Sequence, residues 1–183
     1  MNNWQIRDAV KLLNSGGIIA YPTESVFGLG CNPYNLKAVS RLLEIKQRPY
    51  TKGLILLVSD IKHALPLIQP LNREQLDQIS QPSDRATTWL LNKDPHVSPL
   101  ISGNHPKLAV RIATNPIAKQ LCHSFGKPII STSCNLSSKP MSTKTSEIRN
   151  KFLLKVDKIL SGSCCQQSPS RIVDLETGKI LRD

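Results

Sequence analysis

Aromatic residues, acidic residues and long apolar runs are scarce in this sequence of 183 residues. Aromatic residues make up only 4% of the chain, so few side chains can stack on unpaired bases, which disfavours single-strand RNA recognition. No apolar run approaches the roughly 20 residues of a membrane-spanning helix. The amino terminus carries charge at Arg7, Asp8 and Lys11 and lacks the apolar core of a secretory signal. We therefore expect a cytoplasmic protein that makes no use of a membrane.

The cysteines and histidines form no recognisable metal motif. No C-x-x-C pair occurs, and the histidines do not stand at zinc-ligand spacing from the cysteines. An odd cysteine count of 5 without a secretory signal predicts reduced thiols. The adjacent pair Cys164-Cys165 could bind metal or act in redox chemistry, although adjacent thiols in a polar loop are more often incidental. We predict no metal site formed by the protein.

Basic residues outnumber acidic ones by 24 to 13, which gives a formal net charge of +11. Such an excess favours anionic partners such as nucleotides or RNA, although a solvated basic surface is the simpler alternative. The hydrophobic content of 39% is that of a globular protein. The length suits one domain spanning residues 1–183, which would bury about 70% of the surface of its unfolded chain.

Helical and extended segments alternate along the chain, which predicts an α/β domain with a mixed sheet. Helices are expected at residues 4–14, 36–46, 60–68, 74–79, 116–123 and 146–153. Strands are expected at residues 18–21, 54–58, 87–91, 108–112, 128–131, 156–160, 172–175 and 179–181. The last two would form a hairpin around Thr177-Gly178. Residues 22–30 are expected to be a loop.

The predicted loop at residues 22–30, PTESVFGLG, is the first candidate for chemistry. It follows a strand, where ligands of open α/β sheets bind. It contains hydroxyls, the carboxylate of Glu24 and two glycines that allow close backbone approach. It is not a Walker loop, because G-x-x-x-x-G-K-[ST] occurs nowhere in the chain. A turn without function is the alternative.

Three cations cluster where the helix at 36–46 ends: Lys46, Arg48 and Lys52. Cations at a helix C-terminus can simply offset the helix dipole, a contribution of about 0.3–1 kcal/mol. A loop crowded with Lys and Arg also suits a triphosphate, which concentrates several negative charges in a small volume. Both interpretations remain open from the residues alone.

Two further strands carry polar side chains of interest. The strand at 128–131 runs into the hydroxyl- and amide-rich segment STSCN, which can cradle phosphate oxygens or form a polar turn. Arg111 interrupts the apolar strand LAVRI, and its burial requires a carboxylate partner. That carboxylate can come from the protein or from a substrate, since the guanidinium fork binds either in bidentate fashion.

Taken in order, these segments resemble the YrdC/TsaC family of threonylcarbamoyl-AMP synthases. The matching stretches are PTESVFGLG, Lys46-x-Arg48 with Lys52-Gly53-Leu54, LAVRI, STSCN and the ending SPSRIVDLETGKILRD. The resemblance runs from about Gly16 to the C-terminus. It implies a single-domain open twisted mixed sheet with helices packed on it and a basic concave face.

The resemblance also implies a reaction. ATP, L-threonine and bicarbonate would give threonylcarbamoyl-AMP and pyrophosphate, with Mg²⁺ carried by ATP. Downstream proteins would then transfer the threonylcarbamoyl group to tRNA, to which this chain would bind weakly at most. The alternative is a non-catalytic RNA-binding module that uses the basic face.

Site residues follow from the same resemblance. The residues implied to bind ATP are Lys46, Arg48, Lys52, Lys107, Ser133, Asn135 and Arg182. The residues implied to bind threonine are Thr23, Arg111, Ser131 and Ser170. No covalent nucleophile is expected, because positioning and electrostatics suffice for the reaction. The base that accepts the amine proton stays open between Glu24, solvent and bicarbonate.

The chain departs from the family pattern at several positions. Residues 81–88, QPSDRATT, stand where the family usually has a Trp-Pro-Gly-Pro turn. Cys134 replaces the usual alanine, Ser138 a glycine, and Ser25 and Phe27 a threonine and a tyrosine. The altered turn leaves the local geometry and its effect on the rate open.

Overall fold

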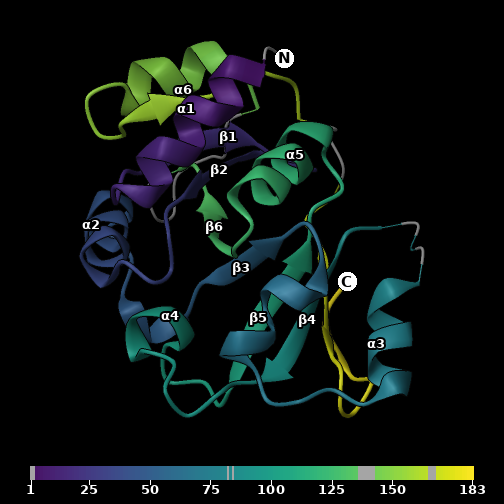
Figure 1. Ribbon diagram of the computed structural model, residues 1–183. Coiled ribbons are helices and arrows are strands. Elements are labelled where there is room, and N and C mark those ends of the chain that lie inside the picture. The colour runs from purple at the N-terminus through teal and green to yellow at the C-terminus, as the bar shows by residue number, and fades with distance from the viewer. Residues whose placement is uncertain (1–2, 82, 84, 136–142, 165–167) are drawn as a thin grey trace.

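The strands of the computed structural model form one nine-stranded mixed sheet, which is shown in Figure 1. The structure describes residues 3–81, 83, 85–135, 143–164 and 168–183. The strands are β1 (Ile19–Pro22), β2 (Phe27–Gly30), β3 (Ile55–Val58), β4 (Thr87–Asn92), β5 (Lys107–Ile112), β6 (Ile129–Ser133), β7 (Lys158–Ile159), β8 (Arg171–Asp174) and β9 (Ile180–Arg182). Their order across the sheet is β7-β1-β2-β6-β3-β5-β4-β8-β9.

Parallel and antiparallel pairs alternate across much of this sheet. The pairs β1–β7, β3–β5 and β4–β8 are parallel, and the others are antiparallel. The predicted hairpin near the C-terminus is the antiparallel pair β8–β9. The expected α/β class with a mixed sheet is therefore confirmed.

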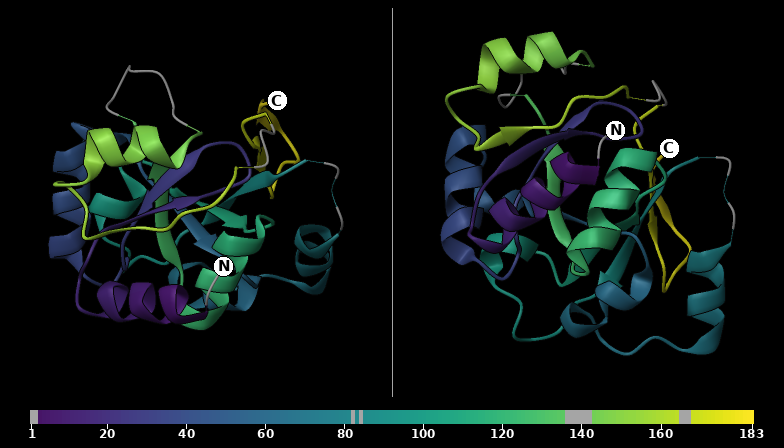
Figure 2. Two further views of the ribbon diagram at one scale, coloured as in Figure 1. Left: turned by 90° about the horizontal axis from the view of Figure 1, so that it is seen from above. Right: turned by 45° about the horizontal axis from the view of Figure 1, so that its top comes forward.

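The helices are packed on both faces of the sheet. They are α1 (Asn3–Asn14), α2 (Leu36–Lys46), α3 (Arg73–Ser80), α4 (Pro99–Ser102), α5 (Pro116–Phe125) and α6 (Thr145–Phe152). Figure 2 shows α1 and α5 side by side, and these two helices share one buried cluster with strand residues such as Tyr21 and Leu57. The neighbouring residues Ala20 and Leu56 point the other way, into the cluster that contains α2 and α6. Among the described residues, every helix is too short or too polar to cross a bilayer.

The capping signals in the sequence identified two helices correctly. The Asn35 side chain accepts a hydrogen bond from the Ala38 amide at 3.1 Å, and α2 spans the predicted residues. The Asn115 side chain accepts from the amides of residues 117 and 118, and Pro116 opens α5. In both cases a few neighbouring residues supply the signal.

Two predictions of secondary structure were wrong. Phe27–Gly30 is a buried strand and not part of a loop, because it pairs with β1 on one side and β6 on the other. The predicted helix at 60–68 is a pair of 3₁₀ turns, Ile61–His63 and Leu65–Leu67. Pro66 lacks the backbone N–H that a continuous helix needs. The short helix α4 was not predicted.

Close strand approach explains why β2 contains glycine. A Cβ atom at Gly30 would lie 2.7 Å from the Ile130 carbonyl oxygen and 2.8 Å from the Tyr21 ring. We expect Gly30→Ala to lower the free energy of unfolding by about 2 kcal/mol, because the core is overpacked. Urea denaturation measures this. Gly178→Ala is the control, since open space surrounds its Cβ and only its positive φ costs about 1 kcal/mol; equal losses in the two variants would contradict the steric explanation.

Candidate functional site

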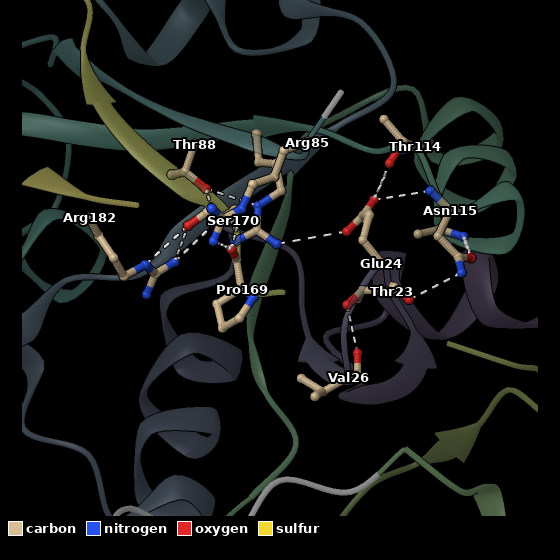
Figure 3. Close-up of polar contacts among 12 residues, drawn as sticks. Thr23, Glu24, Val26, Arg85, Thr88, Thr114, Asn115, Pro169, Ser170 and Arg182 are labelled. Atoms are coloured by element: carbon tan, nitrogen blue, oxygen red, sulfur yellow. Dashed lines mark hydrogen bonds and ion pairs between the residues drawn. The ribbon is translucent and has the colours of Figure 1, made fainter. Parts of the chain in front are cut away.

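Thr23 and Glu24 follow β1 directly and are both buried. The Thr23 hydroxyl donates a hydrogen bond to the Val26 carbonyl at 2.6 Å, and this contact closes the turn between β1 and β2. Figure 3 shows this bond beside the contacts of Glu24. The turn thus presents the Thr23 oxygen and holds the neighbouring carboxylate inside the protein.

Glu24 is bound by the start of α5 and by Arg111. Its Oε1 accepts from the amides of Thr114 and Asn115 at 2.8 and 3.0 Å (Figure 3). Its Oε2 lies 3.8 Å from Arg111 Nη1. The side chain of Glu24 is only 1% exposed. These contacts make Glu24 a fixed partner of Arg111, which argues against the suggestion that it accepts a proton from the substrate.

Arg111 lies in the middle of the sheet, where β5 pairs with β3 and β4. Its Nε donates to Thr88 Oγ1 at 2.9 Å, and Thr88 is its registered neighbour on β4. Burial lowers the pKa of Arg111, while the charge of Glu24 raises it. The question left open by the sequence is therefore answered in part: a protein carboxylate does pair with Arg111. Among the described residues no hydrogen bond uses its Nη2, so these donors can bind a second carboxylate.

Ser170 and Arg182 lie next to Arg111 on the same side of the sheet. Ser170 Oγ is 2.8 Å from Thr88 Oγ1. Arg182 donates through Nη2 to the Ser170 carbonyl at 2.7 Å and to the Ser170 hydroxyl at 3.2 Å (Figure 3). The charge of Arg182 further lowers the pKa of Arg111. Three segments far apart in the sequence thus converge on one polar cluster.

Ser131 connects this cluster to β1 and β2. A Cβ atom at Gly28 would lie 3.1 Å from Thr23 Cγ2 and 3.4 Å from Ser131 Oγ, so these two residues pack closely against the glycine and leave little room for a side chain. The Tyr21 hydroxyl is buried nearby and has no hydrogen-bond partner among the described residues. Burial raises the pKa of Tyr21.

Lys46 ends α2 and binds the turn that follows β6. Its ammonium donates to the Asn135 carbonyl at 2.6 Å, to Asn135 Oδ1 at 2.8 Å and to both oxygens of Ser133. Ser133 Oγ donates to Asn135 Oδ1 at 2.7 Å. Burial and the charge of Arg48 lower the pKa of Lys46 to about 8. The Lys46 ammonium therefore fixes the positions of Ser133 and Asn135 relative to each other.

Arg48 and Lys52 lie on the segment after α2. Gln47 has a left-handed backbone with φ of 50°, which ends α2 and turns the chain into the loop that carries Arg48. Arg48 Nη2 donates to the Gly53 carbonyl at 3.0 Å, whereas its buried Nε has no hydrogen-bond partner in the part of the chain that the structure describes. Burial lowers the pKa of Arg48. Lys52 is exposed.

Lys107 opens β5 and is held by two carboxylates. Its ammonium lies 2.7 Å from Asp174 and 3.0 Å from Glu176. The hydrogen bond to Asp174 raises the pKa of Lys107. Its position on β5 puts it on the same side of the sheet as Arg111, four residues further along.

The structure brings most of the predicted site residues together. Ser131 and Ser133 are two residues apart on β6, so they share one side of the sheet and connect the Arg111 cluster with the Lys46 cluster. Sequence reasoning missed Thr88 and the pairing of Glu24 with Arg111. Neither carries a local signal, because the partners meet only through the register of distant strands.

The variant segment at 81–88 is anchored by Arg85. Its guanidinium donates to the Pro169 carbonyl at 2.8 Å (Figure 3). It also pairs with Asp183 at 3.1 Å. Cys134 is a buried free thiol, as are Cys31 and Cys122, and Cys164 is buried as well. The predictions that concern Ser138, Cys165 and residues 82 and 84 of the variant turn fall on positions outside the described residues.

Comparisons with known proteins agree with the family resemblance of the sequence motifs. The Sua5/YciO/YrdC family model, described as "Telomere recombination", matches residues 11–183. A Vibrio campbellii protein named threonylcarbamoyl-AMP synthase is 40% identical, over 100% of this chain and 99% of that protein. A Hahella chejuensis protein of the same name is 41% identical, with full coverage of both chains.

Solved structures of proteins from this family also match the fold of this chain. The crystal structure of P. abyssi Sua5 complexed with L-threonine matches with a TM-score of 0.87 and 30% identity, over 98% of this chain and 53% of that chain. This chain therefore spans about half the length of the P. abyssi protein. E. coli YciO matches with a TM-score of 0.82 and 26% identity, over 100% of this chain and 90% of that chain.

Proposed function

Because the chain belongs to the Sua5/YciO/YrdC family, we propose that it makes threonylcarbamoyl-AMP and pyrophosphate from ATP, L-threonine and bicarbonate. The resemblance drawn from its motifs is confirmed by the family match and by full-length relatives that bear the name of this enzyme. The observation that supports the site most is the convergence of Arg111, Ser170 and Arg182 on the side of the sheet that also carries Ser131 and Ser133.

Threonine is the ligand of the Arg111 cluster in this proposal. The guanidinium of Arg111 binds the threonine carboxylate through the donors that Glu24 and Thr88 do not use. The hydroxyls of Thr23, Ser131 and Ser170 make the other contacts to the amino acid. The complex of P. abyssi Sua5 with L-threonine supports a threonine site on this fold. Polar groups built to meet a substrate hydroxyl reject amino acids that lack one.

ATP is the ligand of the Lys46 cluster. Ser133 and Asn135 contact the triphosphate, and Lys46 holds both of them and adds a positive charge. Arg48 and Lys52 neutralise further phosphate charge from the neighbouring loop. Arg182 lies on the edge strand β9, contacts Ser170 and serves the nucleotide from the threonine side. Lys107 would have to exchange Asp174 and Glu176 for the nucleotide.

Mg²⁺ arrives with ATP in this proposal. Among the described residues, no three acidic, histidine or cysteine side chains converge on one point, so phosphate oxygens would supply most of its ligands. When bound, the ion neutralises phosphate charge. The protein supplies the arginine and lysine contacts around it.

The reaction needs positioning more than covalent catalysis. The threonine amine and bicarbonate combine to a carbamate with loss of water, and a carbamate oxygen then attacks the α-phosphorus of ATP. The bond from the α-phosphorus to the bridging oxygen breaks, and pyrophosphate leaves. The cations and hydroxyls hold the reactants and offset the charge that develops on phosphate. Solvent or bicarbonate accepts the amine proton, since Glu24 is already bound by two amides and Arg111.

The product feeds tRNA modification, where partner proteins move the threonylcarbamoyl group onto tRNA in the cytoplasm. The enzyme itself binds tRNA weakly at most. A non-catalytic RNA-binding module was the alternative, and the names of the full-length relatives favour the enzyme.

Pyrophosphate release provides the test. We expect release from ATP only when both L-threonine and bicarbonate are present, with alanine and serine as poor replacements. Coupled detection of pyrophosphate and chromatography of the labelled adenylate measure it. Release that ignores threonine, or equal use of alanine, would contradict the assignment, and strong salt-dependent RNA binding without turnover would favour the RNA-binding module.

A further inference from the structure

Thr88 and Ser170 form a buried pair of hydroxyls beneath the Arg111 cluster. Their Oγ atoms are 2.8 Å apart, and either atom can be the donor. Thr88 is 0% exposed and Ser170 is 2% exposed. One arginine donates into each member: Arg111 Nε to Thr88 at 2.9 Å and Arg182 Nη2 to Ser170 at 3.2 Å.

This pair of hydroxyls lacks an acceptor for one of its two protons. Each hydroxyl carries one proton, and guanidinium groups only donate, so neither arginine can accept one. One proton fills the bond between the two hydroxyls. The other finds no acceptor among the residues that the structure describes. An unmade hydrogen bond of a buried donor is costly, so an outside acceptor is required.

Burial decides which of the two hydroxyls carries the free proton. Thr88 is completely enclosed, and Ser170 Oγ is the only acceptor for its proton among the described residues. Ser170 is 2% exposed, so it is the member of the pair that keeps some access to the surface. The order of donation is therefore Arg111 to Thr88, then Thr88 to Ser170, then Ser170 to a ligand. The Ser170 hydroxyl presents its hydrogen, not its lone pairs, to whatever binds there.

The Thr23 hydroxyl acts toward a ligand as a hydrogen-bond acceptor, whereas Ser170 acts as a donor. Its proton is used on the Val26 carbonyl at 2.6 Å, and no donor to its oxygen exists within the described residues. It therefore offers lone pairs to a ligand N–H or O–H. A pocket with donors at Arg111 and Ser170 and an acceptor at Thr23 matches an amino acid, whose carboxylate accepts and whose amine and hydroxyl donate.

We propose that Thr88 is a positioning residue. It accepts a hydrogen bond from Arg111 and donates its own proton to Ser170, so that the Ser170 hydroxyl donates to an oxygen of the bound amino acid. This inference rests on the proposed function, because it takes threonine as the ligand. It assigns a role to a residue that does not itself contact the substrate. The accepting oxygen belongs to the carboxylate or to the side-chain hydroxyl.

Thr88→Val tests the relay, because valine keeps the shape and β-branching of threonine but loses the hydroxyl. We expect Kd and KM for L-threonine to rise about tenfold, the size of one lost hydrogen bond, with KM for ATP unchanged. Thr88→Ser should restore threonine binding to within about threefold of the wild type, since it keeps the hydroxyl. Calorimetry with L-threonine and steady-state kinetics measure these values.

Thr87→Val is the matched control. Thr87 is the next residue on β4 and therefore points to the opposite side, where its hydroxyl donates to the Arg85 carbonyl at 3.2 Å. We expect threonine affinity in this variant to equal that of the wild type. Unchanged threonine binding in Thr88→Val would overturn the proposal, and so would equal losses in Thr88→Val and Thr88→Ser, or a parallel loss of ATP binding. If the wild type itself bound no threonine, the proposed function would fail instead.

A ligand analogue identifies the accepting oxygen. L-2-Aminobutyrate has the carboxylate of threonine but no side-chain hydroxyl. If Ser170 donates to the carboxylate, Thr88→Val weakens binding of both ligands equally. If Ser170 donates to the hydroxyl, the penalty is seen with threonine and disappears with L-2-aminobutyrate. A penalty for L-2-aminobutyrate alone would contradict both forms of the relay.

Discussion

Arg111→Ala is expected to lower kcat/KM for L-threonine at least 100-fold while KM for ATP changes little. A charge-assisted hydrogen bond contributes about 1.5–3 kcal/mol, and about 2.7 kcal/mol corresponds to 100-fold. Removing the guanidinium also leaves Glu24 buried without its cation, 3.8 Å from where Arg111 Nη1 had been. That carboxylate would then repel the incoming threonine carboxylate. Pyrophosphate release at varied threonine and ATP measures the two KM values.

Loss of stability has to be separated from loss of binding in this variant. Breaking a buried ion pair by removing one partner costs about 3 kcal/mol. The double variant Arg111→Met with Glu24→Gln removes both charges and should recover much of that stability in urea denaturation. It should not recover threonine turnover. Recovery of turnover together with stability would show that Arg111 only supports the fold.

Lys46→Ala is expected to lower kcat at least tenfold, and Arg48→Ala should have an effect of similar size. Without the ammonium, Ser133 and Asn135 lose the group that donates hydrogen bonds to their oxygens. The turn after β6 then loses its fixed position, and a positive charge is lost beside the phosphates. Steady-state kinetics with ATP measure the loss. Lys37→Ala, at the exposed start of the same helix, is the control.

The pH profile provides a second readout of the role of Lys46. Its pKa of about 8 implies that kcat/KM for ATP falls as pH rises through 8, because the free enzyme loses the ammonium. Stability moves the other way. The folded pKa lies below the ordinary value of 10.5, so the unfolded chain binds more protons between these values and this lysine makes stability rise with pH. Unfolding driven by Lys46 therefore does not explain the fall, and a flat profile to pH 10 would contradict the phosphate role.

Local signals predicted the elements that a few neighbouring residues determine. Helix α2 follows from the Asn35 cap and its apolar face, and β3 follows from the apolar run LILLV. The strand Phe27–Gly30 was missed because its two glycines suggest a turn. The partners that make it a strand are β1 and β6, and β6 lies about a hundred residues further along the chain.

In the candidate site, too, the sequence determined one part and the tertiary structure the other. The sequence alone determined which kinds of groups are present: cations after α2, hydroxyls after β6 and an arginine that must find a carboxylate. Only the tertiary structure decided that Glu24 is that carboxylate, that Lys46 holds Ser133 and Asn135, and that Thr88 stands between Arg111 and Ser170. Residue type and short-range capping act within a few positions of the chain. Partner choice depends on the register between strands far apart in sequence, where a shift of one residue would turn each of these side chains to the other face.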